Sequence, residues 1–298
     1  MMPETHRFHV GAFACTTVSD GTGIYPGQFF FSNLRAEQWS PQVVARGQLP
    51  GAMEVPTICL VIQTGRHRVL VDTGSGRYKP TTGRLIPNLR AVGIDPRAID
   101  VVVLTHAHGD HVGGLRDARG ALAFANARYV VLRQEWEFWM SNPDLLELPI
   151  PPEMRDLLRG AATRQLSAIE SKLDRVEPGT EIVPGVTAIA AFGHTPGHMA
   201  VEVTSADKRL LFVADAIVDP INLEHPEARC VTDSQPEQTV QTRRSLLERA
   251  AAENPLVAAT HFPFPGVGRV GRRGEGWAWR PVMSRNSSTI RTPSSEPL

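Results

Sequence analysis

The chain has 298 residues, of which 42% are hydrophobic, and its 31 basic side chains balance its 31 acidic ones. This composition excludes a disordered chain, and the zero formal charge gives no overall attraction to nucleic acid or to anionic lipid. The apolar runs are far shorter than the roughly 20 residues that a bilayer requires, and the first ten residues lack the apolar centre of a secretory signal. We therefore expect a cytoplasmic protein that binds neither nucleic acid nor membranes.

Short apolar runs along the chain predict a protein rich in buried strands. The first two, at 57–64 and 68–72, are separated by Gly65 and predict a β-hairpin, and the fully apolar run 99–104 predicts a buried strand. Further strands are predicted at 129–132, 186–191, 199–204, 209–214 and 256–259. Helices are predicted at 41–48, 133–140, 152–173 and 236–253.

This order of elements predicts an α/β (α+β) fold, a four-layer αββα sandwich of two mixed β-sheets flanked by helices. Residues 1–283 are predicted to form a single domain. Residues 284–298 are rich in Ser, Thr and Pro, which predicts a disordered tail.

A dense cluster of potential metal ligands directly follows the strand at 99–104. The segment His106-Ala107-His108-Gly109-Asp110-His111 contains three imidazoles and one carboxylate, the ligands that suit zinc and related divalent ions. Alternate side chains of an extended segment share a face, so His106 and His108 can converge on one ion. A polar loop with solvated histidines is the alternative, which this density of ligand types disfavours.

Further ligands for this cluster must come from other strand ends, because one loop cannot complete two metal sites. His198 opens the strand at 199–204, Asp215 ends the strand at 209–214, and His261 follows the last predicted strand. His194 lies four residues before His198, and on chemistry alone either histidine could be the ligand.

Asp72 stands at the end of the second hairpin strand, where the glycine-containing segment 73–76 leaves the sheet. Its carboxylate could accept a hydrogen bond from the ligand loop, which begins at Thr105, and so orient the ligands. An Asx-turn is an equally good and compatible interpretation.

The ordered motifs of this chain resemble those of the metallo-β-lactamase fold superfamily over about residues 57–265. The resemblance is carried by His106-x-His108-x-Asp110-His111, by Gly193-His194-Thr195-Pro196-Gly197-His198, by Asp215 and His261, and by the upstream Asp72-Thr73-Gly74. The segments Val18-Ser19-Asp20-Gly21 and His261-Phe262-Pro263-Phe264-Pro265-Gly266 look most like the methyl parathion hydrolase and quorum-quenching lactonase-type group.

The resemblance implies an αββα fold that holds two divalent metal ions, most suitably zinc, with manganese, cobalt or iron as alternatives. It assigns one ion to His106, His108 and His198, the other to Asp110, His111 and His261, and a bridging position to Asp215. His198 is preferred over His194 on the family pattern, which leaves His194, with Asp72 and Thr105, to shape the surroundings of the ligands.

Such a centre implies a hydrolase that cleaves a small ester, lactone or organophosphate with a metal-bridging hydroxide. The catalytic residues would be Asp215, as the bridging ligand, and Asp110, which could also accept a proton. A mononuclear iron dioxygenase of the persulfide type and a non-catalytic metal-binding protein are the alternatives. The lactone-cleaving relatives usually carry a tyrosine three residues past the bridging aspartate, where this chain has Val218, so the general acid is not assigned.

Aromatic side chains near the predicted site suggest an apolar pocket for a small neutral substrate. Phe262 and Phe264 follow a predicted ligand, and Phe29 belongs to a run of three phenylalanines near the start of the chain. The resemblance also implies a homodimer, since relatives are commonly dimers.

Overall fold

Two seven-stranded β-sheets form the centre of the computed structural model, which describes residues 4–282. The predicted tail at 284–298 lies outside the described residues. In the first sheet the strands are adjacent in chain order, antiparallel from β1 to β4 and parallel from β4 to β7. Its strands are β1 (Thr5–Val10), β2 (Phe13–Tyr25), β3 (Met53–Gln63), β4 (Arg68–Val71), β5 (Val101–Val103), β6 (Arg128–Leu132) and β7 (Leu173–Val176).

The second sheet has the order β14-β13-β12-β11-β10-β9-β8, and in it only the β11–β12 pair is parallel. Both sheets are therefore mixed, as predicted. The strands are β8 (Glu181–Val183), β9 (Val186–Ala190), β10 (Met199–Ser205), β11 (Lys208–Phe212), β12 (Leu256–Ala258), β13 (Val267–Arg273) and β14 (Gly276–Pro281).

The inner faces of the two sheets share one hydrophobic core. In β4, Val69 and Val71 belong to this core, whereas Leu70 points the other way into the core beneath the helices. In β5, Val101 and Val103 point inward and Val102 outward in the same manner. Because both faces of these strands are buried, their sequences read as continuous apolar runs rather than as alternating patterns.

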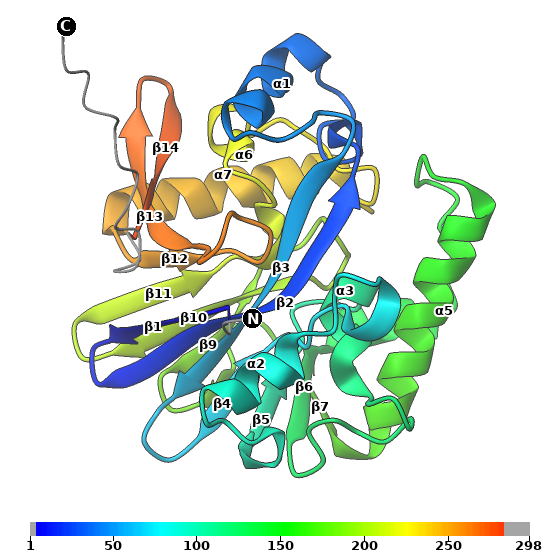
Figure 1. Ribbon diagram of the computed structural model, residues 1–298, viewed down its shortest axis with the longest axis vertical. Helices are drawn as coiled ribbons and strands as arrows, with labels where there is room; N and C mark the ends of the chain where they lie inside the picture. The colour runs from blue at the N-terminus through cyan, green and yellow to red at the C-terminus, as the bar shows by residue number, and fades with distance from the viewer. Residues whose placement is uncertain (1–3, 283–298) are drawn as a thin grey trace, which may run out of the picture.

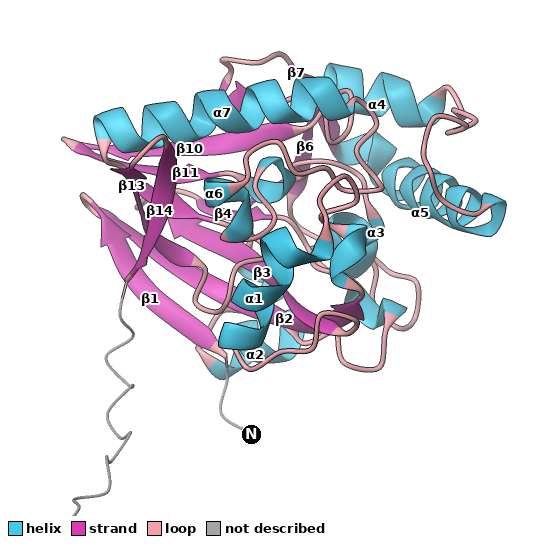
Figure 2. Cartoon of the chain, turned by 90° about the horizontal axis from the view of Figure 1, so that it is seen from above, coloured by secondary structure: helices cyan, strands magenta, loops and turns pink. Residues whose placement is uncertain are grey.

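Helices cover the outer faces of both sheets (Figures 1 and 2). Side chains of α2, α3, α4 and α5 pack on the first sheet, and those of α7 pack on the second. The predicted four-layer αββα sandwich is thus confirmed. The helices are α1 (Ala36–Ala45), α2 (Leu85–Ala91), α3 (Gly109–Val112), α4 (Arg133–Met140), α5 (Pro152–Ile169), α6 (Ile221–Glu224) and α7 (Pro236–Glu253).

Some predicted elements differ from the structure. The helix expected at 41–48 is α1, which begins five residues earlier and contains Pro41 in its interior rather than in its first turn. The helix expected at 152–173 ends at Ile169 and continues as a 3₁₀ turn. The sequence patterns did not predict β1, β2, β7, β8, β13 and β14, in which Thr, Gly or charged residues interrupt the apolar ones.

None of the helices in residues 4–282 combines the length and the apolar character needed to cross a bilayer.

Candidate metal centre

The predicted site residues come from strand ends at one edge of the sandwich. Asp72 follows β4 and Thr105 follows β5, and these two strands are parallel neighbours in the first sheet. In the second sheet the parallel strands β11 and β12 end just before Asp215 and His261. Carboxyl ends of parallel strands lie at the same edge of a sheet, which is where open α/β sheets bind ligands.

Two backbone hydrogen bonds join the sheets at this edge. The amide of Met199, at the start of β10, donates to the carbonyl of Thr105 at 2.9 Å. The amide of Ile58 in β3 donates to the carbonyl of Thr260 at 3.0 Å. These bonds fix the ligand loops of one sheet against those of the other.

Seven ligand-type side chains meet there in three overlapping groups, each with its nitrogen and oxygen atoms within 4.8 Å of one another. The groups are His106, His108 and His194; His106, His111 and Asp215; and Asp110, His111 and His261.

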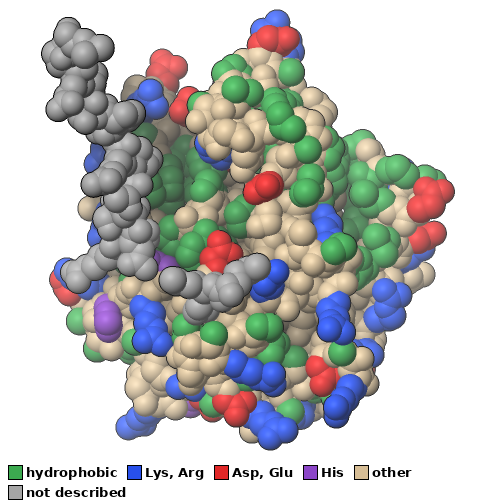
Figure 3. Space-filling model, viewed as in Figure 1, with side chains coloured by type: hydrophobic (Ala, Val, Ile, Leu, Met, Phe, Trp, Pro, Cys, Tyr) green, Lys and Arg blue, Asp and Glu red, His purple; other side chains and the backbone are tan. Residues whose placement is uncertain are grey.

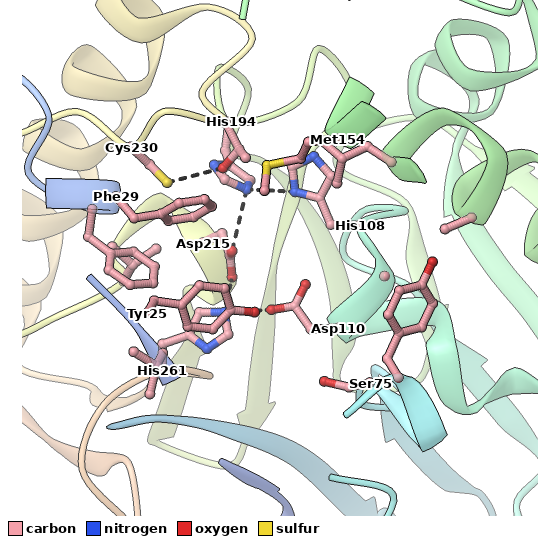
Figure 4. A pocket seen from close by; sticks show the side chains of 18 of the residues that line it. Tyr25, Phe29, Ser75, His108, Asp110, Met154, His194, Asp215, Cys230 and His261 are labelled. Atoms are coloured by element: carbon pink, nitrogen blue, oxygen red, sulfur yellow. Dashed lines mark hydrogen bonds and ion pairs between the residues drawn. The ribbon is translucent and has the colours of Figure 1, made fainter. Parts of the chain in front are cut away.

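Asp215 occupies the middle of these groups. Its Oδ1 lies 3.1 Å from His111 Nε2 and 3.2 Å from His261 Nε2, and its Oδ2 lies 3.3 Å from His194 Nε2. His108 Nδ1 lies 2.9 Å from His194 Nε2 (Figure 4). Through its two oxygens, the Asp215 carboxylate therefore reaches His194 of the first group and His111 and His261 of the third, a position from which it could bridge two ions.

The donor set fits divalent metal ions. His106 Nε2, His108 Nε2, His111 Nε2 and Asp215 Oδ1 are buried and have no hydrogen-bond partner among residues 4–282. Buried polar atoms are rarely left unpaired, because each costs free energy comparable to a lost hydrogen bond. Imidazole nitrogen and carboxylate oxygen are the zinc ligands of proteins, so bound cations would satisfy all four atoms.

Nearby carboxylates divide the buried imidazoles of the site into two classes. Burial, reinforced by neighbouring imidazoles, holds the pKa of His106 and of His108 well below 6.5, so both rings are neutral, which is the form that binds metal. Burial also opposes the charge on His111 and His261, but the nearby carboxylates, Asp215 above all, raise the pKa of both.

Asp72 holds the ligand loop and one ligand directly. Its Oδ1 accepts the backbone amide of Thr105 at 2.8 Å, and its Oδ2 lies 2.8 Å from His111 Nδ1. The Thr105 hydroxyl donates to the same Oδ2 at 2.9 Å and lies 3.2 Å from His106 Nδ1. A carboxylate behind an imidazole fixes its tautomer and orientation and makes the distal nitrogen a better ligand.

Two further buried carboxylates support the site, and neither was predicted. Asp233 lies 2.8 Å from His194 Nδ1, so it holds His194 as Asp72 holds His111. Glu135, in α4, accepts hydrogen bonds from the Ala107 amide and the Thr195 hydroxyl and thereby ties the first ligand loop to the second. A lone acid in an amphipathic helix or in a turn carries no sequence signal for such a role.

The structure does not place His198 among the groups of converging ligand atoms, in contrast to the assignment made from the family pattern. Both ring nitrogens of His198 face the backbone: Nδ1 lies 2.9 Å from the Ala191 carbonyl, and Nε2 accepts the Asp215 amide at 3.1 Å. His194 takes the place among the ligand atoms instead. His198 thus positions Asp215, and the two histidines exchange the roles that the family pattern suggested.

A pocket of about 220 Å³ opens above these groups (Figure 4). Phe29, which the sequence analysis expected in a substrate pocket, lies on one wall together with Tyr25, Phe30 and Val218. Apolar side chains of α5 form another wall, and in Figure 3 hydrophobic side chains gather over the region of α5. These α5 residues are Met154, Leu157, Leu158 and Ala161, and the segment after β4 adds Ser75, Tyr78 and Lys79.

The other two predicted pocket residues do not line this pocket. Phe262 is 1% exposed and packs against Trp279 on the outer side of the second sheet, with ring centroids 4.8 Å apart. Because His261 points into the site, the next side chain points away from it. Phe264 is half-buried and also lies outside the lining.

Comparison with known proteins identifies the family. The family described as metallo-beta-lactamase superfamily matches residues 53–261, which is more than half of the chain. The chain belongs to this superfamily. The predicted family is confirmed, and with it the predicted class, a metal-dependent hydrolase.

Similar proteins are lactonases and hydrolases. An N-acyl homoserine lactonase of Bacillus sp. is 26% identical over 234 residues, which cover 71% of this chain and 84% of that protein. A solved structure described as AidC, a dizinc quorum-quenching lactonase, has a TM-score of 0.90 at 24% identity and covers 96% of this chain and 99% of its own. The solved structure of the hydrolase AbOPH has a TM-score of 0.87 at 24% identity, and the match covers 96% of this chain and 100% of that one. At this identity the two structures support the fold alone.

The exchanged roles of the two histidines are testable. His194→Ala should bind fewer metal ions per chain than the unchanged protein, because it removes a ligand atom. His198→Gln keeps an acceptor for the Asp215 amide, so it should retain the metal and lose only thermal stability. Elemental analysis and thermal unfolding of both variants check this. Metal loss in His198→Gln, with full metal in His194→Ala, would restore the original assignment.

Metal affinity should fall as the pH is lowered from alkaline values toward the ordinary histidine pKa of 6.5. His111 and His261 have raised pKa values in the metal-free chain, so an incoming ion must displace their protons. Affinity is therefore greatest above these raised values and is lost as the pH falls through them. Competition with a chelator of known proton affinity measures it, and a constant zinc affinity across the range would contradict the expectation.

Proposed function

We propose that this protein is a dinuclear metal-dependent hydrolase that opens lactones and cleaves related carboxylic esters bearing an apolar substituent. The observation that carries the proposal is the pair of ligand groups joined through Asp215 at the floor of a largely apolar pocket. The names of its relatives, N-acyl homoserine lactonases, support this substrate class.

His106, His108 and His194 would hold one ion, and Asp110, His111 and His261 the other, with Asp215 between them. When bound, two divalent ions supply an acidified water and polarise the oxygen atom under attack. The ligand set of nitrogen and oxygen atoms favours zinc, with manganese, cobalt and iron as alternatives.

The protein's own residues would orient the ligands, move a proton and exclude water. Asp72 and Asp233 hold His111 and His194 through their Nδ1 atoms. The side chain of Asp110 is 27% exposed, whereas that of Asp215 is 7% exposed, so Asp110 is the carboxylate better placed to accept a proton from the pocket.

The apolar walls favour a neutral substrate over a strongly anionic one. Phe29 and Phe30 on one side and Leu157 and Leu158 on the other present hydrocarbon to the pocket, and Lys79 is the one Lys or Arg side chain in its described lining. An acyl chain would gain free energy there in proportion to the apolar surface it buries. The mononuclear dioxygenase is less well supported, since one ion would leave a second group of ligand atoms without a function.

The proposed activity is tested with protein of measured metal content on a matched panel of substrates. The panel contains an N-acyl homoserine lactone, a 4-nitrophenyl ester, a phosphotriester and a cephalosporin. We expect the highest kcat/KM with the lactone, loss of activity on chelation and its return on adding zinc. Failure to hydrolyse any lactone or ester with two ions bound, or a clear preference for the phosphotriester, would contradict the proposal.

The α5 wall should select for the length of the acyl chain. Leu157→Asn should raise KM for a long-chain lactone by about fivefold, which corresponds to about 1 kcal/mol of lost apolar contact, and leave a short-chain lactone unaffected. Leu146→Asn is the matched control, because Leu146 is 63% exposed and lies outside the pocket lining. Equal changes of KM in Leu157→Asn for the long-chain and the short-chain lactone would show that the acyl chain does not contact α5.

A further inference from the structure

Tyr25, which the sequence patterns did not single out, places a phenol in the pocket close to the ligand groups. Tyr25 is the last residue of β2, and its ring lines the pocket. Figure 4 shows its hydroxyl oxygen pointing across the pocket floor toward Asp110. Val218, which follows the bridging aspartate by three residues, lines the same pocket with an alkyl side chain and offers no proton.

Contacts on several sides fix the ring of Tyr25. Its centroid lies 5.3 Å from that of Phe29 and 5.5 Å from that of Phe30. The Lys79 ammonium lies 3.4 Å from the ring centroid, and a Cβ at position 23 would come within 2.6 Å of the ring, so Gly23 leaves the space that the ring fills. The ring, and with it the direction of the hydroxyl, is thus held in place.

The hydroxyl of Tyr25 has no hydrogen-bond partner in the protein among residues 4–282, whereas three other polar side chains of the pocket are engaged or more exposed. Lys79 covers the Tyr25 ring, the Thr232 hydroxyl lies 3.0 Å from Cys230 Sγ, and Tyr78 is 44% exposed. Phenols ionise only near pH 10, at about three units above neutrality, so the hydroxyl carries its proton at neutral pH. A protonated donor therefore faces the groups at which the reaction would occur.

We propose that Tyr25 is a catalytic residue whose hydroxyl donates a hydrogen bond to the leaving oxygen of the lactone or ester. This proposal rests on the proposed hydrolysis. In that reaction the bond between the acyl carbon and the leaving oxygen breaks, and its electron pair stays on the oxygen. The water oxygen bonds to the acyl carbon, and one water proton ends on the leaving oxygen. Tyr25 stabilises the charge developing on that oxygen and is unchanged at the end.

Leaving groups of different quality distinguish this role from a merely structural one. The alkoxide released from a lactone is a poor leaving group and needs the hydrogen bond, whereas 4-nitrophenolate leaves readily without help. Tyr25→Phe should lower kcat for a lactone by roughly 100-fold, mostly without a change in KM, and leave kcat for a 4-nitrophenyl ester of the same acyl chain nearly unchanged.

Tyr129→Phe is the matched control, since it removes a buried hydroxyl that lies outside the pocket lining and donates to the Phe124 carbonyl, and it should leave kcat for both substrates nearly unchanged. Tyr25→Phe should keep its metal content and thermal stability, because the hydroxyl bonds no described part of the protein. Equal losses on both substrates, or full lactone activity in Tyr25→Phe, would overturn the role of Tyr25 while leaving the proposed function intact. A metal-loaded unchanged protein that cleaves neither substrate would overturn both.

Discussion

The buried carboxylate of Asp215 and the imidazoles around it are the interaction on which the rest of the site depends. His111, His194 and His261 approach its two oxygens within 3.3 Å, yet they come from loops of both sheets. Burying a carboxylate is costly unless positive charge compensates it, and buried imidazole nitrogens are costly unless each has a hydrogen-bond or metal partner. Divalent cations would supply this positive charge and would also polarise a substrate. The cations that make burial of these side chains tolerable would therefore be the ones that make hydrolysis possible.

The sandwich meets this constraint by bringing strand ends of both sheets to one edge and by holding the loops there with buried carboxylates. Asp72 and Asp233 each lie behind one imidazole, and Glu135 connects the two ligand loops. Such supports matter because metal and substrate chemistry tolerate only small errors in the position of a ligand. The pocket above the site is built differently, mostly from apolar walls, which in the proposed function would exclude water and contact a substituent rather than the reacting bond.

Much of the architecture follows from local patterns in the sequence. The ligand motif at 106–111 lies directly after an apolar strand, so its position at a sheet edge could be predicted. The choice between His194 and His198 could not, because it depends on which ring nitrogens the distant backbone of Ala191 and Asp215 engages. Phe262 was misplaced for a related reason, since residue spacing does not reveal which side of a strand end faces the pocket. Long-range contacts decide these details, and no single sequence displays them.

The most direct measurement of the central claim is anomalous X-ray diffraction at the zinc edge from crystals of the zinc-loaded protein. The account predicts two peaks in each chain, one bound by His106, His108 and His194 and the other by Asp110, His111 and His261, with Asp215 touching both. A single peak, or a peak bound by His198, would contradict it.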